Sequence, residues 1–143
     1  MAPNVPQEVL DRSPFSSLIG PIEVTWEPSP IFETVVRHDC SNTMGRMHGG
    51  FLAALIDITA GQGTKRLLDD DRSLVTATTN TEYIGTALVG DRLRVEVAVD
   101  HSSSTMISSS CRIWTGNRLV AIASVVFSAD QAPRSSVPSG AGR

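Results

Sequence analysis

Asp57 is the residue that most needs a chemical explanation, because it is a lone carboxylate in an apolar helical stretch. No other acidic residue occurs between Arg46 and Lys65, and positions 51, 52, 55, 56 and 58 are Phe, Leu, Leu, Ile and Ile. A helix that is apolar nearly all round is normally buried. Since burying an unpaired carboxylate costs on the order of several kcal/mol, we expect Asp57 to be buried and to have either a partner or a function.

Small side chains surround Asp57 on its own face of the expected helix, where residues three or four apart are neighbours. The residues one turn away in either direction are Ala53, Ala54, Ala60 and Gly61. They leave space for a substrate or a facing backbone to approach the carboxylate, and no Arg or Lys lies close to it on the same helix. A reactive carboxylate is one interpretation. The structural alternative is an Asp that caps backbone groups of a neighbouring subunit.

The start of the same helix is suited to holding an anion. His48, Gly49 and Gly50 lie where the chain enters the helix, so unpaired backbone N–H groups and the positive end of the helix dipole point outward there. Glycine lets a ligand come close to the backbone, and such a terminus can stabilise a developing oxyanion. With a carboxylate about two turns further on, this segment becomes a candidate active site.

The elements around this helix predict an α+β domain, in which an antiparallel sheet wraps around one helix. Hydrophobic periodicity and β-propensity predict a helix over 49–68 and strands over 22–26, 31–36, 74–84, 92–99, 105–114 and 118–127. Residues 1–20 are expected to form a helix or arm that Pro14 interrupts, and residues 21–128 the folded domain. Residues 129–143, rich in Ser, Pro, Gly and Ala, are expected to be a disordered tail.

Composition limits the function classes. The chain has 143 residues, 41% hydrophobic and 19% charged, with a net charge of −3, which fits one domain with a real core. No basic stripe or set of aromatic residues indicates a nucleic-acid partner. No stretch reads as a signal peptide or a membrane span. The two cysteines are then expected to be reduced thiols, and the protein cytoplasmic.

Two blocks of residues resemble a known family. The run from Asn42 to Gly50 contains Gly45 and ends in His-Gly-Gly, and Asp57 follows nine residues after His48. This pattern resembles hotdog-fold thioesterases of the phenylacetyl-CoA thioesterase (PaaI) type. A second block, Asn-Thr-Glu-Tyr-Ile at 80–84 with Gly-Asp at 90–91, resembles the strand that follows the helix in that family. The resemblance covers about residues 22–128.

The resemblance implies a hotdog fold, in which a five- to six-stranded antiparallel sheet curls around a central helix. It implies a homodimer that joins two sheets into one, commonly paired again as a dimer of dimers, with active sites at the dimer interface. The implied activity is hydrolysis of an acyl-CoA thioester to a free acid and CoA. CoA would then be part of the substrate, and neither a separate cofactor nor a metal is implied.

The resemblance also assigns roles residue by residue. Asp57 would be the nucleophile or the general base that activates water, and the backbone N–H of Gly49 would polarise the thioester carbonyl. Asn42 would orient water or the carbonyl, and His48 would hold the loop and the thioester. Thr76 corresponds to a Ser or Thr that often reaches across from the other subunit to position the water.

Substrate binding is expected from two further segments. Gly50 continues the glycine pair at the start of the helix. Residues 102–104 are Ser-Ser-Ser, where the family often has a Gly followed by Arg or Lys just before the next strand. Ser104 and Thr105 are therefore the expected contacts to the CoA phosphates, with hydroxyl groups in place of a cation.

Other readings of the polar residues are weaker. Residues 37–40 with His48 match none of the usual zinc spacings, nothing marks Cys40 as an activated nucleophile beside His48, and residues 108–110 read as a polar sheet face. Two alternatives to a thioesterase stay open: a non-catalytic acyl-CoA-binding hotdog protein, and a hotdog dehydratase or hydratase, although no Asp-x-Asn-x-x-His loop occurs. The acyl group, aromatic or of short to medium chain length, also stays open.

Overall fold

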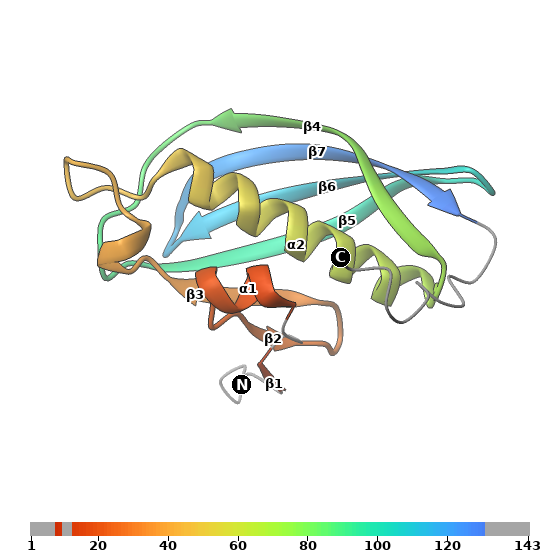
Figure 1. The fold of residues 1–143 in the computed structure, drawn as a ribbon, viewed down its shortest axis with the longest axis horizontal. Coiled ribbons are helices and arrows are strands. Elements are labelled where there is room, and N and C mark those ends of the chain that lie inside the picture. The colour runs from red at the N-terminus through yellow and green to blue at the C-terminus, as the bar shows by residue number, and fades with distance from the viewer. Residues whose placement is uncertain (1–7, 10–12, 131–143) are drawn as a thin grey trace, which may run out of the picture.

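The computed structural model describes residues 8–9 and 13–130, which form one antiparallel sheet and two helices (Figure 1). The strands lie in the order β1-β2-β3-β5-β6-β7-β4. The helices are α1 (Pro14–Ile19) and α2 (Gly49–Leu68), and a short 3₁₀ turn covers His38–Cys40. The strands are β1 (Glu8–Val9), β2 (Glu23–Thr25), β3 (Ile31–Val35), β4 (Ser73–Tyr83), β5 (Arg92–Ser102), β6 (Met106–Thr115) and β7 (Arg118–Asp130).

The predicted α+β architecture is confirmed: one long helix lies diagonally across one face of the sheet (Figure 1). Six strands, β2 to β7, correspond to the six expected from periodicity. The two-residue strand β1 pairs with β2 and adds a seventh at that edge. The loops between β5, β6 and β7 are short. Strand β5 pairs with β6, and β6 pairs with β7.

The residues that flank helix α2 define both of its ends. The Nδ1 atom of His48 accepts a hydrogen bond from the Gly50 N–H at 2.8 Å and so caps the N-terminus. At the other end Asp69 adopts a left-handed conformation (φ 48°). Lys65 and Arg66 lie in the last turn, where positive charge interacts favourably with the helix dipole.

One face of α2 packs on the sheet, and the opposite face does not. The buried residues recur at helical spacing: Phe51, Leu52, Leu55, Ile56, Thr59, Ala60, Gly63 and Thr64. A buried hydrogen bond of 2.6 Å between the Thr64 and Ser109 hydroxyls fixes the helix to β6. The expectation that α2 is buried all round was therefore wrong for a single chain, and Asp57 lies exposed on the uncovered face. Its Ala and Gly neighbours count as apolar in the sequence but contribute little surface to bury.

Two smaller expectations were also wrong. Pro14 starts α1 and does not interrupt it, because Ser13 caps the helix and proline is favoured in the first helical position. Residues 129 and 130 belong to β7 and not to a tail, since Ala129 pairs with Leu74 in register and is 8% exposed. The rest of the expected tail, 131–143, lies outside the described residues.

Strand β4 forms one edge of the sheet. It is 11 residues long and pairs only with β7 among the described strands. Most of its side chains are exposed, including Val75 and Tyr83 at 49% and 53%. A long, largely uncovered edge strand is a template for pairing with another strand.

Glycine at position 63 is required by the close approach of α2 to the sheet. A Cβ atom there would lie 3.0 to 3.1 Å from three atoms of the Val97 side chain. At Gly61, two residues earlier in α2, the atom nearest to an added Cβ would be 4.0 Å away, on the Phe127 ring. We predict that Gly63→Ala lowers the free energy of unfolding by about 1–3 kcal/mol through overpacking.

The control is Gly61→Ala, which should raise the free energy of unfolding by about 0.5–1 kcal/mol through helix propensity. Denaturant unfolding of both variants measures the difference. Equal stability of the two variants would contradict a tight contact between α2 and β5 at Gly63.

Candidate active site

Asp57 is held by a residue of the neighbouring strand. The Thr76 hydroxyl on β4 donates a hydrogen bond of 2.6 Å to Oδ1 of Asp57. None of the ion pairs found within residues 13–130 includes Asp57. The resemblance implied that Thr76 reaches across from another subunit, and this is corrected here, since both residues belong to one chain. The hydroxyl fixes one carboxylate oxygen, and among the described residues no hydrogen bond is found to the other oxygen of this exposed side chain.

The N-terminus of α2 offers a backbone donor that is not used within the chain. His48 accepts from Gly50 through Nδ1, so its ring proton in this arrangement is on Nε2. Gly50 was expected to bind substrate, but its N–H is already engaged in capping. In the described part of the chain the Gly49 N–H has no hydrogen-bond partner, and both glycines are exposed. Of the two glycines, Gly49 is therefore the one whose N–H remains available to a ligand.

Asn42 shapes the loop that precedes the helix. Its side-chain oxygen accepts from the Met44 and Arg46 N–H groups at 2.9 and 3.2 Å. The loop is tied to the segment after β4, because Met47 N–H donates to the Ala87 carbonyl at 2.8 Å. With its oxygen occupied, Asn42 retains its NH₂ group for a ligand, which suits a carbonyl oxygen and not a proton donor.

The two halves of the candidate site are separated along α2. Gly49 and Asp57 are eight residues apart, which corresponds to about 12 Å along the helix axis. A donor within about 3 Å of a carbonyl oxygen and a nucleophile within about 3.5 Å of its carbon lie roughly 8 Å apart at most, including the C=O bond of about 1.2 Å. Direct attack by Asp57 on a carbonyl held by Gly49 of the same chain is therefore not compatible with this spacing.

Tyr83 is a residue of the site to which the sequence assigned no role. It ends β4, and its hydroxyl donates to the Gly49 carbonyl at 3.1 Å. Its ring would lie 3.6 Å from a Cβ atom at Gly49. The second sequence block contained this tyrosine, but only pairing in space brings it to the start of α2.

The expected phosphate-binding turn is held by a cation from elsewhere in the chain. Arg72, which precedes β4, donates to the carbonyls of Ser103 and Ser104 at 3.3 and 3.0 Å. The same guanidinium binds both carboxylate oxygens of Asp70 and holds the pKa of that carboxyl below its usual value. Ser104 and Thr105 lie at the end of the sheet where Arg72 binds. Because Asp70 pairs with Arg72, little net positive charge is available there.

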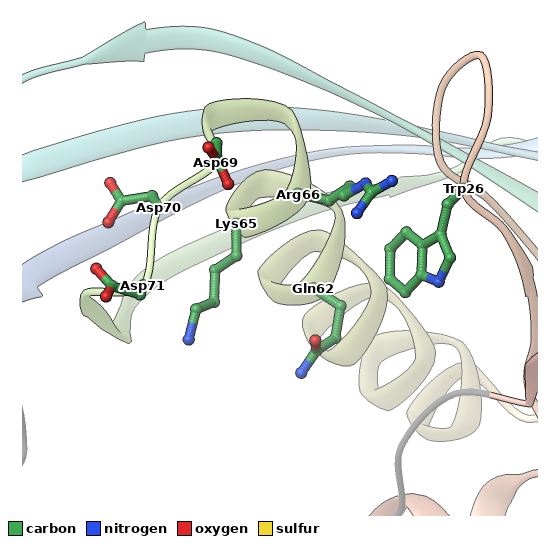
Figure 2. Close-up of a pocket in the computed structure, with 7 residues that line it drawn as sticks. All are labelled: Trp26, Gln62, Lys65, Arg66, Asp69, Asp70 and Asp71. Atoms are coloured by element: carbon green, nitrogen blue, oxygen red, sulfur yellow. The ribbon is translucent and has the colours of Figure 1, made fainter.

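A pocket of about 520 Å³ lies at the C-terminal end of α2 (Figure 2), and its lining includes neither Gly49 nor Asp57. Its walls include Trp26 and the acidic residues 69–71. Arg66 points toward Trp26 and lies 5.5 Å from the ring centroid. It also pairs with Glu27 at 2.7 Å. Asp70, also in the lining, pairs with Arg72 outside the pocket. None of the predicted site residues lines this pocket.

The cysteines are placed away from nucleophilic chemistry. Burial raises the pKa of the Cys40 thiol, and it raises the pKa of Cys111 to about 12. Cys40 contacts His48 through backbone atoms, since its carbonyl accepts from the His48 N–H at 2.9 Å. Across residues 8–9 and 13–130, no three His, Cys, Asp or Glu side chains form a group that could hold a metal ion. In the same residues, no helix is long and apolar enough to cross a membrane.

With this geometry, comparison with known proteins defines the class of protein. The profile of the Thioesterase superfamily matches residues 44–122. A protein named "Putative esterase PA0474" from Pseudomonas aeruginosa is 34% identical over 130 residues, which cover 87% of this chain and 96% of that protein. The chain belongs to the thioesterase superfamily, and its fold is the hotdog fold of these enzymes.

Solved structures agree on the fold. The conserved protein PA5202 from Pseudomonas aeruginosa has a TM-score of 0.75 at 25% identity, covering 83% of this chain and 95% of its own. A mutant of the phenylacetic acid degradation protein PaaI from Thermus thermophilus has a TM-score of 0.72 at 20% identity, covering 81% and 98%. A hypothetical thioesterase from Streptococcus pneumoniae, solved with coenzyme A, has a TM-score of 0.68 at 21% identity, covering 76% and 87%.

The placement of the thiols predicts that the native protein reacts slowly with thiol reagents. A raised pKa lowers the fraction of thiolate at pH 8, and thiolate is the reactive form. We expect both cysteines to stay unmodified by a thiol-reactive dye at pH 8 over minutes, and both to react after unfolding in denaturant. Rapid modification of either thiol in the folded protein would contradict the burial of Cys40 or Cys111.

Proposed function

We propose that this protein hydrolyses acyl-CoA thioesters to a free acid and CoA, with Asp57 as nucleophile or general base. The observation that carries the proposal is the Thr76–Asp57 pair on the exposed face of α2, at 2.6 Å. The free N–H of Gly49 at the start of the same helix supports it. Membership of the thioesterase superfamily and the coenzyme A bound to a protein of the same fold are consistent with it.

The proposed site is shared between two copies of the chain. Gly49 and Asp57 of one chain are too far apart to act directly on one carbonyl, and the β4 edge is free to pair. Antiparallel pairing of two β4 strands about their middle brings the Tyr83 end of one strand to the Ser73–Thr76 end of the other. Asp57 and Thr76 of one chain then approach Gly49 of the other. Pairing in this way makes a two-fold dimer with two identical sites.

The proposed chemistry follows from these groups. The thioester oxygen accepts from the Gly49 N–H and, in the same loop, from the Asn42 amide, so charge that develops on the oxygen is stabilised. The free oxygen of Asp57 either removes a proton from water, which attacks the thioester carbon, or attacks that carbon itself. In both routes the C–S bond breaks and CoA leaves as thiolate. In the second route water then hydrolyses the mixed anhydride.

The first test is release of CoA thiol from a panel of phenylacetyl-, benzoyl-, short- and medium-chain acyl-CoAs. We expect wild type to turn over at least one of them. Asp57→Asn should lower kcat by about 10²–10⁴-fold, because the amide is neither base nor nucleophile, without changing the unfolding midpoint. Wild-type rates in this variant would exclude Asp57 from the reaction. Binding of acyl-CoA without turnover in wild type would instead support a non-catalytic acyl-CoA-binding protein.

Two substitutions of Thr76 separate the effect of its hydroxyl on kcat from the effect of its side-chain shape. Thr76→Val keeps the branched shape and removes the donor to Asp57, and we expect kcat to fall about tenfold or more, as for loss of a hydrogen bond to a charged group. Thr76→Ser retains the hydroxyl and serves as the matched control, with kcat close to wild type. Equal rates for the Val and Ser variants would show that the hydroxyl does not orient the carboxylate.

A mixing experiment tests whether two chains share each site. Gly49→Pro removes the N–H, and proline is accommodated at the first helical position, so we expect this variant to fold and to lose about 10²–10³-fold in kcat. Equal amounts of Gly49→Pro and Asp57→Asn chains, unfolded together and refolded, form mixed dimers with one intact shared site. About a quarter of wild-type activity should return.

The two variants refolded separately and then combined provide the control, and they should stay inactive if subunits exchange slowly. A site within one chain predicts no recovery in either case, because every chain then carries one of the two defects. Light scattering during size-exclusion chromatography, run on both samples, establishes that dimers are present.

A further inference from the structure

The peptide between Gly49 and Gly50 is fixed from both sides. Its carbonyl accepts from the Tyr83 hydroxyl at 3.1 Å, and its N–H donates to Nδ1 of His48 at 2.8 Å. A peptide unit is planar, so two hydrogen bonds on opposite edges define its orientation. Consecutive glycines would otherwise give this segment more backbone freedom than any other residue pair.

The hydrogen bond from Tyr83 is not needed to satisfy the helix. The Gly49 carbonyl lies in the first turn, where carbonyl groups already accept from the helix itself, and only N–H groups lack partners. Tyr83 is 53% exposed, so its packing contributes little to the core. A side chain that adds little to the core, and yet bonds to the residue of the proposed oxyanion donor, is placed to act in the reaction.

Space at Gly49 supports the same conclusion. A Cβ atom at this position would be 3.6 Å from the Tyr83 ring, an ordinary van der Waals distance. Folding would therefore tolerate a side chain here, and the glycine leaves room for something that approaches from outside. The ring forms one wall of that room.

We infer that Tyr83 is a positioning and specificity-determining residue of the thioester site, an inference that rests on the proposed function. Its hydroxyl holds the peptide after Gly49, so that the adjacent Gly49 N–H stays directed at the thioester oxygen. Its ring lies against the groups next to the thioester carbonyl and so discriminates between acyl groups. Because Thr76 and Tyr83 lie on the same strand, β4 orients both the carboxylate and the oxyanion donor.

Two substitutions separate the hydroxyl from the ring. Tyr83→Phe keeps the ring and should lower kcat about 5- to 10-fold, the loss expected for one hydrogen bond, with KM and the order of preference among acyl-CoAs unchanged. Tyr83→Leu should show a similar loss in kcat and, in addition, a changed ratio of kcat/KM between benzoyl- and hexanoyl-CoA. The split between kcat and KM distinguishes positioning from a general loss of structure.

Glu82→Gln is the matched control. Glu82 precedes Tyr83 on β4, but side chains alternate along a strand, so Glu82 lies on the other face of the sheet from Tyr83. Its cross-strand partner on β7 is Ile122. This variant should have wild-type kcat, KM and acyl preference. Dimer mass, measured by light scattering, should be unchanged in all three variants.

The outcomes are separable from those of the proposed function. If wild type hydrolyses acyl-CoA and Tyr83→Phe retains wild-type kcat, the hydroxyl does not position Gly49. If Tyr83→Leu keeps the wild-type acyl preference, the ring is not a wall of the site. If Tyr83→Phe changes the oligomeric state measured by light scattering, Tyr83 acts as a subunit contact, and the inference is overturned. If wild type itself has no turnover, the proposed function fails, and the inference fails with it.

Discussion

The contact between α2 and the sheet is the constraint on which the rest of the structure depends. Gly63 lets the helix approach Val97 closely, and the buried bond between Thr64 and Ser109 fixes it there. A sheet with a single long helix covers only one face of that helix. On its other face Asp57 is touched by Thr76 of β4 but stays exposed, so the carboxylate keeps hydration and needs no buried counter-charge.

Strand β4 both forms an edge of the described sheet and carries residues of the candidate site. It is an uncovered edge, and two of its side chains bind α2: Thr76 at the carboxylate of Asp57 and Tyr83 at the carbonyl of Gly49. A strand that joins a second copy through one edge is held in place by the same pairing. In the dimer that we propose, the geometry of the site would depend on this pairing, because each chain carries two halves of the candidate site that are separated along α2.

Regular elements were predictable because their periods are local properties of the chain. The helix over 49–68 was expected and found with those ends, because its apolar spacing lies within it and its capping residues, His48 and Asp69, adjoin it. The edge strand β4 was predicted from β-propensity, but its position beside β7 was not. Most of the differences from expectation depend on partners in space: β1 forms by pairing with β2, and β7 extends to Asp130 because β4 lies alongside. Pro14 is the exception, because the adjacent Ser13 cap places it at the start of α1.

By itself, the sequence determined the class of fold, the long helix and the residue types of the candidate site, because the hydrophobic period and the His-Gly-Gly to Asp spacing are local. Only the tertiary structure decided that Asp57 lies at the surface, that Thr76 bonds to it within one chain and that Tyr83 reaches Gly49. Each of these depends on which strand lies beside α2 and on the angle between them. Backbone pairing across the sheet sets both, and no single segment of sequence encodes them.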